Sequence, residues 1–395
     1  MGAISRYTSL GLLFLLSTQA TPIKTNKYCV QLNVPVQISA KNTHFDTPRV
    51  DKTSDVANWV WDIWTWSHLN KSRDLGVIPV HDTFNINARL CIPTRGAKSH
   101  ILQVATHGSG YDKAYWDVPV HPEKYSYLEA AINHGYSVLI YDRLGIGASS
   151  KPDAYDIVQL PAQVEVLKEL TTLARNGDLI ESSQIIGSRH VPFHLARYKP
   201  ERIVHVGHSY GSVTTASLLS KYGEVSDGAI LTGFVVVTNK DVPSIPGSSY
   251  GFEVARENDP ERLGHTPSGY LVQGTTANIQ QFFLGGAAFE PKLLRWSVKN
   301  KQTFTVGERL SRSTDNLPAT EFKGPVQFFV GEYDFPFCDG DCKNAYDVSV
   351  LKSFYPAASD VSTYIQPATG HGLTVTKNAT AGYQVIFSYL GAQGL

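Results

Sequence analysis

Apolar and polar residues alternate in two segments near the start of the chain, 30–38 and 83–92. Because successive side chains of a strand point to opposite faces, a period of two predicts two antiparallel strands, each with one buried face. Between them, in 56–64, apolar residues recur at the spacing of a helix. Such a stripe predicts a helix that packs against the rest of the fold.

Farther along the chain, short apolar runs alternate with helical patterns. The segments that predict buried strands and helices are, in chain order, 101–106 (strand), 122–134 (helix), 136–142 (strand), 158–175 (helix), 203–207 (strand) and 210–221 (helix). Strands that alternate with helices in this way are typical of a mostly parallel sheet with helices on both faces. We therefore expect an α/β fold.

The pattern changes after a predicted strand at 229–237. Prolines and glycines interrupt short helical pieces until a further strand pattern begins at 326–330. A compact domain seldom contains so long a loop without structure of its own. We expect 238–320 to form a cap or lid inserted into one catalytic domain, whose core comprises 21–237 and 321–395.

The composition excludes several classes of protein. Of the 395 residues, 42% are apolar and 18% charged, which is typical of a folded chain and not of a disordered one. Lys and Arg together number 35, as do Asp and Glu, and no run of five basic residues occurs. Because nucleic-acid binding needs clustered basic side chains, we expect no nucleic-acid partner.

The N-terminus has the pattern of a secretory signal peptide. Arg6 precedes the apolar stretch 10–16, and Thr18 and Ala20 place small residues before a cleavage point. The stretch is shorter than the about 20 residues that span a bilayer. We expect cleavage after residues 1–20, an extracellular protein, and no integral membrane segment after signal removal.

The four cysteines form an even set in a chain that we expect to be secreted, where disulfides persist. Three pairings are possible, and we favour Cys29 with Cys91 and Cys338 with Cys342 because each pair lies in segments that should adjoin. A structural zinc site would show CxxC with a nearby His, which the sequence lacks, so we expect no metal.

Two Asn-X-Ser/Thr triplets, at Asn70 and Asn378, are candidate N-glycosylation sites. They can be used only in a eukaryotic secretory route, which fits the predicted signal peptide.

The strongest chemical motif is a GxSxG sequence at 207–211. An apolar strand pattern precedes it and a helical pattern follows it, as a nucleophile elbow requires. In such a turn the serine has a strained backbone, and its neighbours two residues away must be small. We expect Ser209 to be a nucleophile, with Gly207, His208 and Gly211 completing the elbow.

In this context the chain resembles the α/β-hydrolase superfamily over roughly residues 84–390. The segment 106–110 resembles the His-Gly loop that donates an oxyanion-hole N–H in that family. The resemblance implies that Ser109 and Tyr210 donate their backbone N–H groups to the oxyanion.

A second segment, 141–149, resembles the DRxGxGxS segment of the family. It lacks the third glycine of a dinucleotide-binding GxGxxG loop. We therefore expect Asp142 and Arg143 to be architectural.

The family order is Ser, acid, His. Asp334 follows a predicted strand and matches the family's acid position, and His371 in a Gly-His-Gly turn matches its histidine position. Of thirteen histidines, His371 alone follows the acid candidates. The acid stays open, because other carboxylates lie nearby: Glu332, Asp339, Asp341 and Asp347.

These features indicate a secreted serine hydrolase that cleaves small-molecule carboxylic esters without a cofactor. A serine nucleophile argues against the carboxylate-based epoxide hydrolases and haloalkane dehalogenases of the superfamily. The general pattern resembles secreted fungal hydrolases, some of which cleave lactones or esters of secondary metabolites. No feature of the sequence indicates an oligomeric state.

Two alternatives remain at this stage. A peptidase of the same fold would need an acidic pocket for a substrate ammonium group. The lid carboxylates that are candidates for it are Glu253, Glu257, Asp259 and Glu261. A solvated acidic helix face also explains them. A non-catalytic binding module on a hydrolase scaffold is the other alternative.

Overall fold

The computed structural model describes residues 26–65, 68, 72–187, 193–236, 251–311 and 318–395. The predicted signal peptide, residues 1–20, and the predicted glycosylation site Asn70 lie outside these ranges. Within them, no helix is both long enough and apolar enough to cross a membrane.

A nine-stranded sheet with the order β12-β11-β7-β6-β3-β4-β2-β1-β5 forms the centre of the molecule. Its strands are β1 (Lys27–Phe45), β2 (Asp74–Pro93), β3 (Ile101–Thr106), β4 (Ser137–Tyr141), β5 (Gln184–Ile186), β6 (Arg202–His208), β7 (Gly228–Thr232), β11 (Val326–Gly331) and β12 (Val361–Gln366). The six strands from β12 to β4 are parallel, and β2, β1 and β5 extend the sheet with antiparallel pairing.

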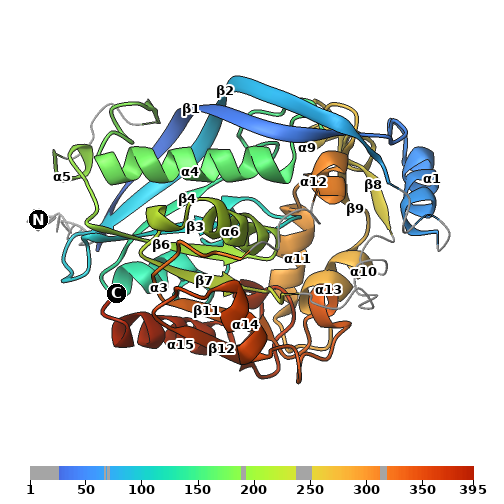
Figure 1. Cartoon of the computed structure of the whole chain (residues 1–395). Coiled ribbons are helices and arrows are strands. Elements are labelled where there is room, and N and C mark those ends of the chain that lie inside the picture. Colours follow the sequence, from blue (N-terminus) through green and yellow to red (C-terminus); the bar gives the residue numbers. More distant parts are fainter. Residues whose placement is uncertain (1–25, 66–67, 69–71, 188–192, 237–250, 312–317) are drawn as a thin grey trace, which may run out of the picture.

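Helices cover both faces of this sheet (Figure 1). Along β3, Leu102 and Val104 belong to the core on the side of α4, and Ile101 and Ala105 to the core on the side of α3 and α15. Because both faces are buried, the central strands are mostly apolar, with few polar residues such as Gln103 and His205. The helices of the main fold are α2 (Pro122–Tyr125), α3 (Tyr127–Asn133), α4 (Leu160–Asn176), α5 (Phe193–Ala196), α6 (Tyr210–Lys221), α13 (Phe335–Cys338), α14 (Val348–Phe354) and α15 (Ala379–Ala392), with short turns η2 (Lys113–Tyr115), η3 (Gly223–Val225) and η5 (Leu373–Val375). The α/β fold predicted from the sequence is confirmed.

The long ribbon of β1 and β2 carries the first disulfide. Cys29 and Cys91 are paired residues of the two strands, and their sulfur atoms are bonded. The helix α1 (Thr53–Trp64) connects the strands and buries Val56 and Trp59. Both strands are longer than the alternating segments that predicted them.

Two predicted elements differ from the structure. The strand predicted at 229–237 ends at Thr232, because Gly233 follows with a φ of 53° and turns the chain. The helix predicted at 122–134 is divided at Ser126, whose side chain accepts a hydrogen bond from the backbone N–H of Glu129 and so begins α3.

Between β7 and β11 the chain forms a second, three-stranded antiparallel sheet with the order β10-β9-β8. These strands and the short helices around them lie at one end of the main sheet (Figure 1). The elements are β8 (Phe252–Val254), α8 (Ala255–Asn258), α9 (Pro260–Leu263), β9 (Tyr270–Gln273), α10 (Thr276–Ile279), η4 (Gln280–Leu284), α11 (Pro291–Lys299), β10 (Phe304–Thr305) and α12 (Val306–Ser311). The predicted boundaries of a cap at 238 and 320 fall in or beside ranges that are not described, and they stay predictions.

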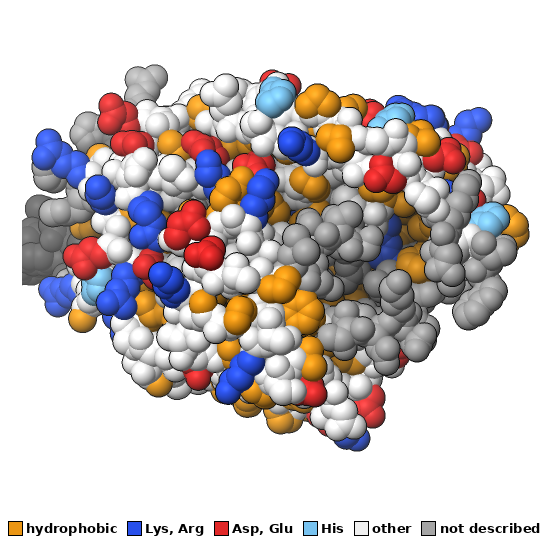
Figure 2. All heavy atoms as spheres, viewed as in Figure 1, with side chains coloured by type: hydrophobic (Ala, Val, Ile, Leu, Met, Phe, Trp, Pro, Cys, Tyr) orange, Lys and Arg blue, Asp and Glu red, His pale blue; other side chains and the backbone are white. Residues whose placement is uncertain are grey.

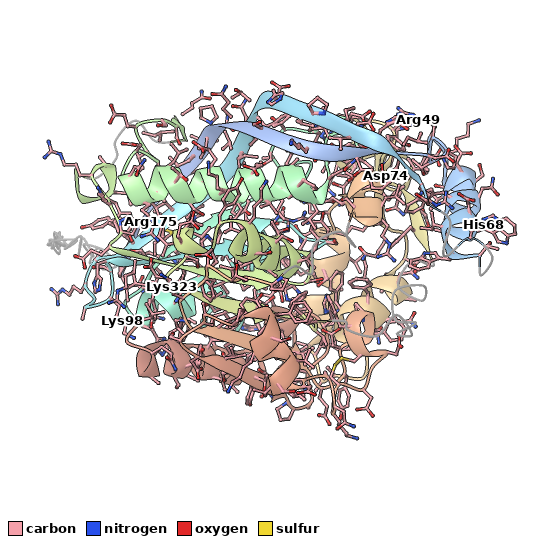
Figure 3. All side chains as sticks on the ribbon, in the orientation of Figure 1. Arg49, His68, Asp74, Lys98, Arg175 and Lys323 are labelled. Atoms are coloured by element: carbon pink, nitrogen blue, oxygen red, sulfur yellow. A yellow bond between two sulfur atoms is a disulfide. The ribbon has the colours of Figure 1, made fainter. Side chains whose placement is uncertain are left out.

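Charged side chains at the end of the main sheet far from β8 and β9 have structural partners. Lys98 and Arg175 lie at that end in Figure 3. Lys98 donates hydrogen bonds to the Tyr136 hydroxyl and to the carbonyl of Leu395, and Arg175 pairs with Asp227 at 2.7 Å. On the face shown in Figure 2, acidic and basic side chains are interspersed.

Candidate active site

The candidate catalytic residues follow the carboxyl ends of the parallel strands. Ser209 comes directly after β6, Asp334 follows β11 and His371 follows β12. The carboxyl ends of parallel strands lie along one edge of a sheet, where ligand sites of open α/β sheets are found.

Ser209 occupies a sharp turn between β6 and α6. Its φ of 54° and ψ of −120° are rare for a residue with a side chain, and such strain clusters at functional sites. A methyl group on Gly207 would lie 2.6 Å from Cα of Ser212, and one on Gly211 would lie 2.1 Å from the carbonyl oxygen of Thr106. The backbones therefore approach too closely for any side chain at these two positions.

The loop after β3 lies directly against this turn. A methyl group on Gly108 would lie 2.8 Å from Cβ of Ser209, so the loop backbone is in contact with the serine. Ser109 follows and lines the same cavity as Ser209 and Tyr210. Tyr210 is the first residue of α6, where backbone N–H groups point out of the helix end.

Asp334 and His371 form a fully buried hydrogen-bonded pair. Nδ1 of His371 and Oδ2 of Asp334 are 2.6 Å apart, and both side chains have no exposed surface. The other carboxylate oxygen, Oδ1, accepts the backbone N–H of Phe337 at 3.0 Å. A carboxylate accepts but cannot donate, so Nδ1 of His371 carries the proton and Nε2 is left as an acceptor.

Nε2 of His371 is buried and has no hydrogen-bond partner among the described residues. The Ser209 hydroxyl is therefore not bonded to it in this structure. Such bonds are often long or poorly aligned in unliganded enzymes and tighten with substrate. His371 packs against the rings of Phe282 and Phe337, both of which line the cavity at Ser209.

The other acid candidates near Asp334 have different surroundings. Glu332 accepts the backbone N–H of Ala368, and Asp347 is the N-cap of α14. Asp339 and Asp341 are exposed. Among these carboxylates, the structure pairs Asp334 with His371.

A second disulfide closes the loop that carries Asp334. Cys338 and Cys342 are bonded, and the carbonyl of Asp334 accepts backbone N–H groups from Cys338 and Gly340. The backbone N–H of Cys342 donates to the carbonyl of Glu332. These bonds restrain the acid-bearing turn from both sides.

His208 lies beneath the serine and behind His371. Its ring stacks on Tyr115 at 4.4 Å and lies 4.9 Å from the ring of His371. Because Thr232 donates its hydroxyl to the carbonyl of Gly207, it accepts from Nδ1 of His208. Complete burial holds the pKa of His208 well below its usual range, so its ring is neutral and adds no charge beside His371.

Arg143 connects the strand edge to the inserted segment. Its guanidinium is buried, forms an ion pair with Glu308 of α12, and lies 4.6 Å from the ring centre of Tyr210. Its Nε donates to the carbonyl of His107 at 3.0 Å. Asp142 accepts hydrogen bonds from Lys113 and Ala148, and lines no part of the cavity.

An open cavity lies above Ser209, with a volume of about 550 Å³ that includes open solvent. Its lining combines aromatic rings with a few polar side chains: Ser109, Ser209, Tyr210, Phe252, Gln273, Phe282, Phe304, Glu308, Arg309, Pro336 and Phe337. Mostly apolar walls with few polar groups are typical of small-molecule sites.

Several of these residues were not identified from the sequence. Gln273 and Glu308 carry no local motif, and the Arg143–Glu308 pair joins residues far apart in the chain. The apolar run at 270–272 is too short to predict a strand. No signal in the sequence would have placed these residues at the cavity.

The four acidic residues considered for a peptidase lie elsewhere, because none lines the cavity. Three of them have partners: Glu253 accepts from Asn258, Glu257 from Thr53, and Asp259 pairs with Arg262. Among the described residues, no group of three or more His, Cys, Asp or Glu side chains is arranged to hold a metal ion.

The predicted glycosylation site Asn378 is half-buried at the start of α15. Its Nδ2 donates to the carbonyl of Pro367 at 2.8 Å, and the hydroxyl of Thr380 donates to the carbonyl of Lys124. Its glycosylation stays a prediction.

Similar solved structures cover most of the chain at low identity. They include a thermophilic esterase from Thermogutta terrifontis, 16% identical over 79% of this chain and 94% of that chain, with a TM-score of 0.47. A bromoperoxidase from Bacillus anthracis is 16% identical over 78% and 96%, with a TM-score of 0.47. An epoxide hydrolase from Vigna radiata is 13% identical over 78% and 95%, with a TM-score of 0.49.

No curated protein sequence gives a significant match to the chain. A family model described as the alpha/beta hydrolase family, however, matches residues 104–375. This range contains the elbow, the loop after β3, Asp334 and His371, and it is more than half of the sequence. The chain therefore belongs to the alpha/beta hydrolase family.

Proposed function

We propose that this alpha/beta hydrolase is a secreted serine hydrolase that cleaves carboxylic esters through a Ser209–His371–Asp334 triad. The observation that carries the proposal is that two features occur together at one cavity. These are the strained backbone of Ser209 and the fully buried hydrogen bond between His371 and Asp334. A surface histidine or a structural serine would need neither feature.

In this mechanism Nε2 of His371 takes the hydroxyl proton of Ser209 as the serine oxygen attacks the acyl carbon. Asp334 holds the imidazole with Nδ1 protonated and stabilises the positive charge that develops on the ring. His371 then gives that proton to the leaving alcohol. In the second half-reaction His371 takes a proton from water as the water oxygen attacks the acyl carbon, and it returns the proton to the Ser209 oxygen as the acid is released.

The backbone N–H groups of Ser109 and Tyr210 would bind the oxyanion of the tetrahedral intermediate. One such donor typically contributes about 3 to 4 kcal/mol to lowering the barrier. The contact of Gly108 with Ser209 supports this role, because it brings the loop after β3 close to the place where the acyl carbon would bond to the serine. Arg143 supports the same geometry by bonding the carbonyl of His107 and lying over Tyr210.

Secretion is part of the proposal. It is supported by the signal-like pattern of residues 1–20 and by the two disulfides, which are typical of oxidising compartments. Within this proposal, residues 238–320 form a cap over the core, and Asn70 and Asn378 are glycosylated.

An ester substrate is favoured over a peptide by the aromatic cavity wall. Phe252, Phe282, Phe304 and Phe337 line it. Among the described residues of the lining, Glu308 alone is a carboxylate, and it is paired with Arg143. A substrate ammonium group would find no unpaired carboxylate among these lining residues.

The test is a panel of p-nitrophenyl esters of graded acyl length, compared with aminoacyl arylamides. We expect turnover of esters, loss of that turnover in Ser209→Ala, and retention in Ser220→Ala, a serine near the end of the same helix. Turnover of arylamides alone would replace the esterase with a peptidase. Turnover of neither substrate would favour a binding module.

A further inference from the structure

One face of the small sheet β8-β9-β10 forms a wall of the cavity. Phe252 is paired with Gln273 across β8 and β9, and Phe304 is paired with Leu271 across β10 and β9. Residues two apart on a strand share a face, so Gln273 lies on the same face as both phenylalanines. The two rings are 4.3 Å apart, and all three side chains line the cavity.

Gln273 is the amide group in this aromatic wall. Its side chain is 2% exposed, and its Oε1 atom is buried without a hydrogen-bond partner among the described residues. The amide lies over the oxyanion loop, because a methyl group on Gly110 would be 2.8 Å from Oε1. Buried side-chain carbonyls are normally bonded, so one left without a donor at a ligand cavity requires an explanation.

Other described residues of the lining have roles or partners of their own. Ser209 and the backbone N–H of Ser109 belong to the proposed catalytic machinery. Glu308 is bonded to Arg143 and Gln163, and Arg309 lies over the ring of Trp64. Gln273 has no such role in the chemistry. Its position beside Phe252 and Phe304, next to the loop that carries Ser109, suits recognition of the substrate.

We infer that Gln273 accepts a hydrogen bond from the substrate, so the preferred esters carry a hydroxyl or N–H donor on a flat apolar group. The rings of Phe252 and Phe304 would pack against that group while Oε1 of Gln273 takes the donor. The inference rests on the proposed esterase function and names the substrate class for it.

The size of the effect follows from the loss of one neutral hydrogen bond in a buried site. An ester without the donor loses this bond and also leaves Oε1 of Gln273 unsatisfied, which adds to the cost. We expect a hydroxylated ester to exceed its parent in kcat/KM by about tenfold or more.

The experiment compares three matched substituents, hydrogen, hydroxyl and methoxy, at the para position of a phenyl ring. In the acyl arm the ring is part of a 3-phenylpropanoate p-nitrophenyl ester. In the alcohol arm it is part of a 2-phenylethyl acetate. The methoxy ester keeps the oxygen as an acceptor and is larger than the hydroxyl ester by one methyl group, but it has no donor.

Each substrate is measured with the wild-type chain, Gln273→Leu, Gln273→Met and Gln184→Leu. Leu and Met preserve volume in an apolar wall, so both variants should fold, which thermal unfolding checks. Gln184 is an exposed residue of β5, remote from the cavity, and it serves as the matched control. The readout is the hydroxyl-to-hydrogen ratio of kcat/KM for each protein.

The inference is supported if, in either arm, the hydroxyl ester has a higher kcat/KM than both the hydrogen and the methoxy ester. Gln184→Leu must keep this preference, and the hydroxyl-to-hydrogen ratio of kcat/KM must fall to about one in both Gln273 variants. Ester turnover without that preference, a preference for methoxy, or a preference that survives Gln273→Leu would overturn this inference alone. Failure to turn over any ester would overturn the proposed function, and this inference with it.

Discussion

The elbow at Ser209 and the cavity wall above it are built in different ways. At the elbow, backbones meet so closely that Gly207, Gly211 and Gly108 leave no space for a methyl group. In the wall, the side chains of Phe252, Phe304 and Gln273 form the surface, and their backbones are ordinary strands. The elbow restricts which residues are possible, whereas the wall restricts only size and polarity.

This difference suggests a division between reaction and recognition. A single reaction mechanism requires one fixed arrangement of the catalytic groups. The elbow, the oxyanion loop and the His371–Asp334 pair are accordingly held by backbone contacts and buried hydrogen bonds. Recognition can change by exchange of side chains on a stable strand. The two regions meet at the Arg143–Glu308 pair, which joins the core to the inserted segment.

The largest expected effect concerns Asp334. We expect Asp334→Asn to lower kcat for esters by about 10⁴-fold, because the amide would favour the wrong tautomer of His371. Steady-state ester hydrolysis measures this. Asp341 is an exposed neighbour in the same loop, and Asp341→Asn should keep the wild-type rate. A large loss of kcat in Asp341→Asn with a normal rate in Asp334→Asn would instead assign the catalytic acid to Asp341.

The ion pair that joins the two regions should matter for stability. Glu308→Gln leaves the buried guanidinium of Arg143 without its counter-charge, which costs about 3 to 5 kcal/mol in the free energy of unfolding. Urea unfolding measures the loss. The double variant Arg143→Met with Glu308→Leu should recover most of it, and a loss below about 1 kcal/mol in Glu308→Gln would contradict this account.

Close packing at the elbow makes a smaller but specific prediction. Gly211→Ala would place a methyl group against the carbonyl of Thr106, and we expect about 3 kcal/mol of destabilisation. Gly286→Ala is the matched control, since its methyl group would reach only Cδ2 of Tyr333, at 3.9 Å. Equal unfolding temperatures for the two variants would show that the elbow is not closely packed.

The smallest expected effect is on the pH dependence of the free energy of unfolding, and it concerns the strand that leads to the elbow. Burial lowers the pKa of His205 on β6 to about 3, from the 6.5 of an exposed histidine. Between these values the unfolded chain binds more protons than the folded one, so stability falls as pH drops below 6.5. At pH 5 this costs about 2 kcal/mol.

His205→Leu should remove that dependence. The hydroxyls of Thr171 and Ser226, which contact the imidazole, also lie within hydrogen-bond distance of the carbonyls of Leu167 and Gly228, so both can donate there when the ring is absent. Chemical unfolding at pH 7 and pH 5 should show a fall in stability smaller by about 2 kcal/mol than in the wild type. An unchanged fall would mean that His205 is protonated in the folded chain.

The sequence predicted the parts of the molecule whose signals are local. Buried parallel strands are mostly apolar runs, and the glycines around Ser209 mark the elbow because only they fit there. Cys29 and Cys91 could be paired because their alternating strands predicted a ribbon. Each of these signals lies within a few residues or in one strand pair.

What the sequence could not supply depends on contacts between distant segments. Nothing near Glu308 indicates that its partner is Arg143, and nothing near Gln273 indicates an unbonded carbonyl at a cavity. The end of β7 at Thr232 was also missed, because the apolar run continues while Gly233 turns the chain. Tertiary packing overrides local pattern at such places.

The most direct test of the account is labelling with a fluorophosphonate, which bonds to an activated serine oxygen. Intact-protein mass and peptide mapping would locate the adduct. The account predicts one adduct on Ser209 in the wild-type chain and in Ser220→Ala, and none in Ser209→Ala. A wild-type chain that is not labelled, or a Ser209→Ala variant that still is, would contradict it.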